Sequence, residues 1–141
     1  MSDAHTPGEL EIGPLRRKHL RAVMAIEPQV YSHPWTHSLF LSELALPASR
    51  VYLVARAGRA VVGYAGLMLA PDEAHVTTIA VDPEWRRRRV ATRLLVSLTR
   101  EAASRNYDAM TLEVRLGRWV TRRPPGRWRS RSPRTGALRR G

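Results

Sequence analysis

Between residues 75 and 102 the pattern of apolar residues changes from one typical of a strand to one typical of a helix. This change constrains the fold more than any other feature of the sequence. His75–Val81 is rich in β-branched and apolar residues, which predicts a strand, and Asp82-Pro83-Glu84 ends it. A long amphipathic helix follows, because apolar residues then recur at three- and four-residue spacing: Val90, Leu94, Leu95, Leu98 and Ala102. A strand that passes through a short turn into such a helix indicates a layered α/β fold.

Further extended segments flank this unit on both sides. They are Glu9–Gly13, Val51–Arg56, Ala60–Ala70 and Met110–Leu116. Gly58 lies between the second and the third, so we predict that these two form a hairpin. The last segment alternates apolar and polar residues, as a strand with one buried face does.

Two helices are predicted between the first strand and the hairpin. The first runs from Arg16 to Pro28, which ends it, and the second runs from Thr36, whose hydroxyl can cap it, to Pro47. Asn106 is the predicted stop of the long helix. The order is strand, two helices, three strands, helix and strand, which predicts a mixed α/β fold with an α+β mixed sheet.

The chain has 141 residues, enough for one domain, and its net charge of +12 is concentrated at one end. Residues 117–141 contain nine arginines and no acidic residue, whereas residues 1–116 are nearly balanced. This segment lacks a helical or strand period and buries too little apolar surface to offset its ordering entropy. We therefore predict a folded domain over residues 9–116 and a disordered tail over residues 117–141.

Several classes of protein are excluded by what the sequence lacks. There is no cysteine, so disulfides, thiolate metal sites and a cysteine nucleophile are excluded. No apolar stretch reaches the roughly 18 residues that cross a bilayer, and the N-terminus lacks a secretory pattern. His33 and His37 have no third ligand nearby, so no metal site is expected. These observations favour a cytoplasmic protein without membrane contact.

Four consecutive arginines, Arg86–Arg89, precede the first turn of the long helix. Each cation at a helix N-terminus is unfavourable by about 0.3–1 kcal/mol, because it faces the positive end of the dipole. A bound anion reverses this, since backbone N–H groups and guanidinium groups then converge on one negative group. We predict a seat for a phosphate or diphosphate. On charge alone, the alternative is a solvated basic run or a patch that faces RNA.

The segment Arg86-Arg87-Arg88-Arg89-Val90-Ala91, together with the strand and turn before it, resembles the acetyl-CoA motif of the GNAT acetyltransferase superfamily. The usual motif is Gln/Arg-x-x-Gly-x-Gly/Ala, and this chain departs from it at Arg89, where a glycine would let the backbone approach a diphosphate. Two more stretches, His33–Thr36 and Thr111–Arg115, resemble the bacterial ribosomal-protein alanine N-acetyltransferases. The resemblance covers about residues 9–116 and implies the GNAT fold.

The resemblance also implies a reaction and its residues. Acetyl-CoA would be the co-substrate, and the N-terminal alanine amine of a ribosomal protein would be the acceptor. The residues implied for the pantetheine arm are Ile79, Ala80 and Val81, and those implied for the diphosphate are Arg87, Arg88, Arg89, Val90, Ala91 and Thr92. Glu113 takes the place of the general base. Without the resemblance, the favoured interpretation of Glu113 is a solvent-facing strand residue paired with Arg115.

The end of the chain departs from the family. There, an asparagine that contacts the coenzyme follows this strand, and a later helix carries the tyrosine that protonates the leaving thiolate. Neither residue type occurs after Arg115. We hypothesise that the last 25 residues are an out-of-frame or altered ending that replaces the last helix and two strands, and we expect slower turnover. The competing hypothesis is a non-catalytic protein that binds RNA or the ribosome. Arg86–Arg89 would hold the nucleic acid, and the basic tail would add a weak contact to it.

Overall fold

The computed structural model describes residues 9–113. Its strands are β1 (Glu11–Pro14), β2 (Arg50–Ala57), β3 (Ala60–Leu69), β4 (Ala74–Val81) and β5 (Met110–Leu112). Its α-helices are α1 (Leu20–Val30), α2 (His37–Leu44) and α3 (Val90–Ser104). Short 3-10 helices, η1 (Arg17–His19) and η2 (Pro83–Trp85), precede α1 and the loop before α3.

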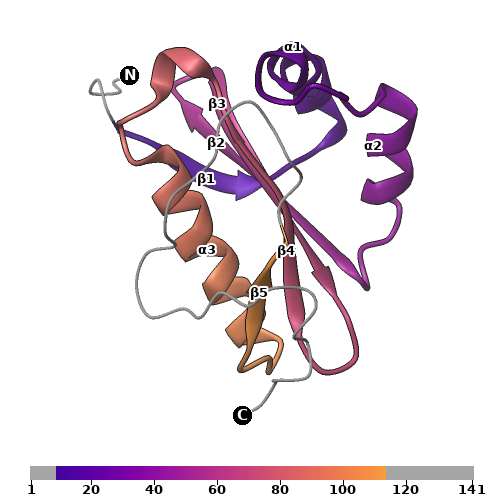
Figure 1. Ribbon diagram of the computed structural model, residues 1–141. Coiled ribbons are helices and arrows are strands. Elements are labelled where there is room, and N and C mark those ends of the chain that lie inside the picture. The colour runs from indigo at the N-terminus through magenta and orange to yellow at the C-terminus, as the bar shows by residue number, and fades with distance from the viewer. Residues whose placement is uncertain (1–8, 114–141) are drawn as a thin grey trace.

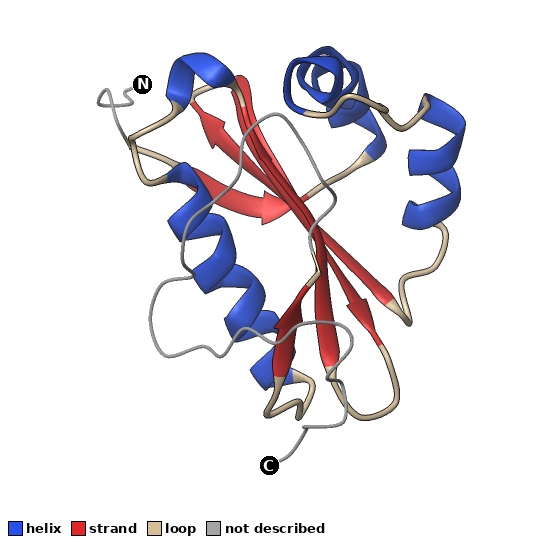
Figure 2. Ribbon diagram, in the orientation of Figure 1, coloured by secondary structure: helices blue, strands red, loops and turns tan. Residues whose placement is uncertain are grey.

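The strands form one sheet in the order β1-β2-β3-β4-β5, with helices on both faces (Figure 1). Neighbouring strands from β1 to β4 are antiparallel, and β5 pairs with β4 in parallel. Helix α3 covers one face, and α1 and α2 lie on the other (Figure 2). The predicted mixed α/β fold, with its order of strands and helices, is therefore confirmed for the described part of the chain.

Each face of the sheet has its own hydrophobic core. Leu94 and Leu98 of α3 are fully buried against apolar residues of β2, β3 and β4, as the predicted stripe requires. On the opposite face, Phe40 of α2 packs edge-on against Tyr64 of β3, with ring centroids 6.0 Å apart. Residues that alternate along one strand therefore contact different helices.

A buried carboxylate joins α1 to the sheet and to the following loop. Glu27 is completely buried, and one of its oxygens accepts a hydrogen bond of 2.5 Å from the Tyr64 hydroxyl. Its other oxygen accepts from the backbone N–H of Trp35 at 2.9 Å. A buried charge is stable only when such donors satisfy it, so Glu27 fixes the position of the α1–α2 loop relative to β3.

The predicted end of the first helix at Pro28 is wrong. Helix α1 includes Pro28 and continues to Val30. Proline removes one backbone hydrogen bond and crowds the preceding turn, which usually stops a helix. Here contacts outside the helix hold the last turn, because Glu27 and Val30 are buried and Glu27 bonds to Tyr64 and Trp35. The helical bond from the Tyr31 N–H to the Glu27 carbonyl is kept at 2.8 Å.

Three predicted local signals are confirmed. The Thr36 hydroxyl accepts the backbone N–H of Leu39 at 3.1 Å, so it caps α2. Gly58 has a φ of +65° between β2 and β3, and Asn106 has a φ of +69° just after α3. Both positions are left-handed, which glycine and asparagine adopt at lower cost than other residues.

The two outer strands differ from their predicted bounds. Strand β1 begins at Glu11 and includes Pro14, because an edge strand tolerates a proline that donates no hydrogen bond. Strand β5 ends at Leu112, although the N–H of Glu113 still bonds to the carbonyl of Val76. Residues 114–116 of the predicted strand and the predicted tail over residues 117–141 lie outside the described residues.

We predict that Gly66→Ala destabilises the fold, because a Cβ there would overlap the ring of Tyr52. The ring is held in place, since its hydroxyl donates to Glu43 Oε1 at 2.7 Å. Overpacking of this kind costs about 1–3 kcal/mol of unfolding free energy, measurable by urea titration. Gly13→Ala is the matched control, because no atom lies within 4 Å of its added Cβ. Equal stabilities for the two variants would contradict the packing.

Candidate active site

The loop between β4 and α3 has the geometry of an anion seat. Arg87 and Arg89 both adopt the left-handed region, with φ of +67° and +64°. Arg87, Arg88 and Arg89 are exposed, and α3 begins directly after them at Val90. The first N–H groups of a helix have no partner within it, so positive charge and backbone donors lie together at one end of the sheet.

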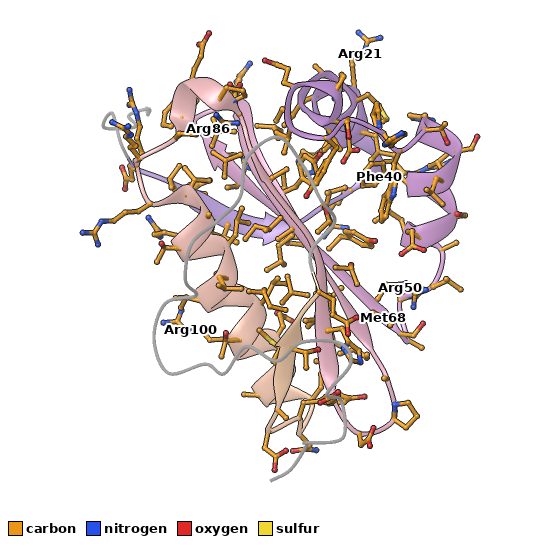
Figure 3. The ribbon with its side chains drawn as sticks, viewed as in Figure 1. Arg21, Phe40, Arg50, Met68, Arg86 and Arg100 are labelled. Carbon is orange, nitrogen blue, oxygen red and sulfur yellow. The ribbon has the colours of Figure 1, made fainter. Side chains whose placement is uncertain are left out.

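The four arginines are not equivalent. Arg86 is half-buried in extended backbone, at the end of the sheet where β4 leads into this loop (Figure 3). The guanidinium of Arg88 lies 4.8 Å from the ring centroid of Trp85, in a cation–π contact. Arg87 and Arg89 flank it in left-handed backbone. The sequence therefore predicts the basic cluster but not its division into one half-buried and three exposed members.

Strand β4 contains a β-bulge in its middle. Its register with β3 shifts, since Gly66 pairs with Thr78 whereas Leu67 pairs with Val76. The bulge reverses the alternation of side chains, so Val76 and Ile79 both lie in the core on the α3 face. Thr78 is placed on the opposite side, where Tyr31 lies.

Tyr31, at the end of α1, bonds directly to the bulged strand. Its hydroxyl lies 3.0 Å from Thr78 Oγ1 and donates to the Ile79 carbonyl at 3.0 Å. The Ile79 N–H donates back to the same hydroxyl at 3.2 Å. The backbone groups of Ile79 are thus bonded to Tyr31, a contact that joins residues 48 positions apart and that no local motif in the sequence indicates.

Within residues 9–113, strands β4 and β5 pair where both begin. Among the described residues, β5 pairs with Ala74, His75 and Val76, and β4 continues for five residues beyond them. Ile79, Ala80 and Val81, the predicted pantetheine contacts, lie on that continuation, next to the arginine loop. The predicted pantetheine contacts therefore lie on the last residues of β4, and the predicted diphosphate contacts lie in the loop that follows and at the start of α3.

Glu113 lies at the end of β5, on the face opposite α3. Leu112 packs against the α3-side core, so the next residue points to the other face. The Glu113 side chain is one-third exposed, and its Oε2 lies 3.8 Å from Nδ1 of His75. The alternative partner considered from the sequence, Arg115, lies outside the described residues.

Metal and membrane signatures were searched in the same part of the chain. No group of three or more His, Asp or Glu side chains within residues 9–113 is arranged to hold a metal ion. Over that range, no helix is both long and apolar enough to traverse a bilayer.

A sequence profile of the acetyltransferase (GNAT) family matches residues 20–118. The match covers well over half of the chain, so the chain belongs to the GNAT acetyltransferase family. The sequence resemblance to this family is thereby confirmed, and with it the predicted fold.

Two curated bacterial proteins are similar to this chain in sequence. A protein of Bacillus subtilis named as a ribosomal protein bS18-alanine N-acetyltransferase is 29% identical over 102 residues, which cover 72% of this chain and 68% of the relative. The N-alpha-acetyltransferase RimI of Mycobacterium tuberculosis is 38% identical over 93 residues, which cover 62% of this chain and 58% of the relative.

Solved structures agree on the fold. The ribosomal-protein-S18-alanine N-acetyltransferase of Escherichia coli superposes with a TM-score of 0.65 at 24% identity, covering 72% of this chain and 64% of that one. The PaiA N-acetyltransferase of Thermoplasma acidophilum, in complex with coenzyme A, gives 0.61 at 14% identity and covers 69% and 74%. The chain thus spans 58–68% of the length of the Bacillus subtilis, Mycobacterium tuberculosis and Escherichia coli proteins.

Arg89→Gly should stabilise the protein, because the wild-type side chain sits in left-handed backbone that costs an L-residue roughly 1–2 kcal/mol. Part of this gain is offset by the entropy of glycine in the unfolded chain, so we expect a net increase of about 1 kcal/mol in urea unfolding. Arg88→Gly is the control, since Arg88 has no positive φ and loses its contact with Trp85. A stabilisation by Arg88→Gly as large as that by Arg89→Gly would argue against strain at residue 89.

Proposed function

We propose that this chain is an acetyl-CoA-dependent N-acetyltransferase whose acceptor is the N-terminal alanine amine of a ribosomal protein. The observation that carries the proposal is the order in which three features lie along β4. The Glu113 carboxylate lies near the start of β4. A bulged segment follows, which has no β5 partner among residues 9–113, and the arginine loop at the N-terminus of α3 comes directly after the strand. The names of the Bacillus subtilis and Escherichia coli proteins support the alanine of a ribosomal protein as the acceptor, and the name of the Mycobacterium tuberculosis protein supports an N-terminal amine.

The arginine loop fits the diphosphate of a coenzyme. Three exposed guanidinium groups and the N-terminal N–H groups of α3 are chemically suited to a doubly charged anion. The residues proposed to hold it are Arg87, Arg88, Arg89, Val90, Ala91 and Thr92. Ile79, Ala80 and Val81 would lie along the adjoining pantetheine arm, and acetyl-CoA supplies an acetyl group activated as a thioester.

Glu113 is the proposed general base. An N-terminal amine is largely protonated at neutral pH and attacks a carbonyl carbon only after it loses that proton. The Glu113 carboxylate, partly shielded beside His75, can accept the proton directly or through one water. Because the chain has no cysteine to carry the acetyl group, the amine attacks the thioester directly.

Turnover is proposed to be slow. The asparagine and the tyrosine that the family places after this strand have no counterpart in residues 116–141. Loss of a general acid lowers a rate by about 10²–10⁴-fold. That segment lies outside the described residues, so the proposal rests on the sequence alone.

Acetyl-CoA should bind saturably in isothermal titration calorimetry, and Arg87→Glu/Arg88→Glu should weaken binding by about tenfold or more, since each lost charge-assisted contact contributes about 1.5–3 kcal/mol. Arg100→Glu, an exposed arginine farther along α3, is the matched control and should leave the affinity unchanged. No binding at millimolar acetyl-CoA would refute the proposal. Binding of RNA instead, falling steeply between about 50 and 200 mM salt, would support the RNA-binding alternative.

Glu113→Gln should lower kcat for an alanine-initiated peptide by about 10²–10⁴-fold, because the amide cannot accept the proton of the ammonium. The affinity for acetyl-CoA should be unchanged, as the carboxylate lies away from the arginine loop. Glu11→Gln on β1 removes a carboxylate that pairs with Arg56 and serves as the control. A Glu113→Gln enzyme with the wild-type rate would remove this residue from the mechanism.

A further inference from the structure

A second group of exposed cations lies at the start of α1, apart from the arginine loop. We call it the α1 patch, and its members are Arg16, Arg17, Lys18 and Arg21. The surrounding sequence, residues 12–26, contains no acidic residue. Within the part of the chain that the structure describes, none of the four side chains pairs with a carboxylate. The positive charge of the patch is therefore not neutralised by an ion pair there.

Two separate elements create the positive potential at this place. The pKa of His19, in the same turn, is lowered by burial and by the charges of three neighbouring groups: Lys18, Arg56 and Arg16. Arg56 belongs to β2, where it pairs with Glu11 at 2.9 Å. The backbone N–H of Arg16 donates to Nδ1 of His19 at 2.9 Å, so the turn that carries the patch is internally bonded. The cations are thus held close together at the surface.

The α1 patch and the arginine loop lie at the same end of the molecule. Figure 3 shows Arg21 and Arg86 toward that end, whereas Arg100 lies farther along α3. The start of β3 adjoins the exit of β4 there, since the Asp82 N–H donates to the Val62 carbonyl at 2.9 Å. The two groups of cations come from different helices, so a diphosphate held by the arginine loop would leave the α1 patch exposed.

The composition of the α1 patch favours a nucleic-acid partner over a membrane surface. A helix that lies on a bilayer combines cations with apolar side chains that insert below the headgroups. The large apolar side chains exposed among residues 9–113 are Leu39, Leu46 and Val96, and none of them lies in the patch. Cations without such apolar neighbours bind the phosphates of a nucleic-acid backbone by charge, and no insertion is needed.

We propose that the α1 patch docks the enzyme on ribosomal RNA, an inference that rests on the proposed ribosomal-protein acceptor. Guanidinium and ammonium groups bind backbone phosphates without reading the base sequence. Arg17 and Arg21 lie about one turn apart where η1 leads into α1, and like charges so placed repel each other. A phosphate between them replaces this repulsion by attraction. Docking would raise the local concentration of an RNA-bound acceptor at the active site.

Salt-dependent binding of the full chain to a fluorescein-labelled oligouridine, followed by fluorescence anisotropy, tests the surface. Each phosphate contact on a single strand contributes about 0.7 to the slope of log affinity against log salt concentration. Arg17→Gln/Arg21→Gln should therefore lower the slope by about 1.4 and weaken binding by about tenfold at about 100 mM salt. Lys18→Gln/Arg21→Gln should give the same loss.

Arg100→Gln/Arg105→Gln is the matched control, because it removes the same net charge from exposed positions of α3 and its end. Glutamine has nearly the helix propensity of arginine, so neither pair of changes should perturb its helix. The control should keep the slope and the affinity of the wild type. Equal losses in the control and in Arg17→Gln/Arg21→Gln would show that only net charge matters and would overturn the inference.

Acetyl-CoA separates the α1 patch from the arginine loop. At saturating acetyl-CoA the proposed diphosphate seat is occupied, so the wild-type chain should still bind oligouridine, and Arg17→Gln/Arg21→Gln should still bind it more weakly. Displacement of oligouridine by acetyl-CoA would place the RNA on the arginine loop and overturn the inference. Binding to vesicles of phosphatidylserine and phosphatidylcholine, without binding to oligouridine, would overturn it in favour of a membrane.

Two further readouts distinguish failure of the docking surface from failure of the proposed catalysis. Arg17→Gln/Arg21→Gln should melt no lower than the wild type, because it relieves repulsion. It should also acetylate a free alanine-initiated peptide at the wild-type rate, since neither residue belongs to the candidate active site. Wild-type RNA binding by this variant would overturn the inference and leave the acetyl transfer intact. A chain that binds RNA through the patch but never binds acetyl-CoA would overturn the proposed function instead.

Discussion

The bulge in β4 is the constraint on which the rest of the site depends. By adding one residue opposite β3, it sends Ile79 into the core beneath α3 and turns Thr78 toward α1. A regular strand would place these two side chains the other way round. The side chains of β4 thus contact α3 on one face of the sheet and the end of α1 on the other. Both helices therefore fix the position of the strand that leads into the arginine loop.

Much of the fold follows from local patterns in the sequence. The stripe of α3, the hairpin turn at Gly58 and the cap at Thr36 each depend on residues close in sequence, so their signals are readable without the tertiary structure. Pro28 shows the opposite case. Its local signal is strong, but buried contacts of Glu27 with Tyr64 of β3 and with Trp35 hold the final turn of α1.

The site is only partly predictable for the same reason. Spacing alone indicates an anion seat at Arg86–Arg89, because loop and helix are contiguous in the chain. The partners of Tyr31 and of His75 are distant in sequence, at Ile79 and at Thr111, and they meet only through strand pairing and the α1–sheet contact. Alternation predicts which face Glu113 occupies, but it carries no information about the neighbouring imidazole.

The Tyr31 hydroxyl has a consequence for ligand selection at β4. The N–H and the carbonyl of Ile79 already have good hydrogen bonds to it. An amide chain that approached this stretch would exchange partners with the phenol rather than form contacts where none existed, and such an exchange contributes little net free energy. Discrimination between long thin molecules along this edge must then come from the fit of their apolar parts and from the contacts of their charged end.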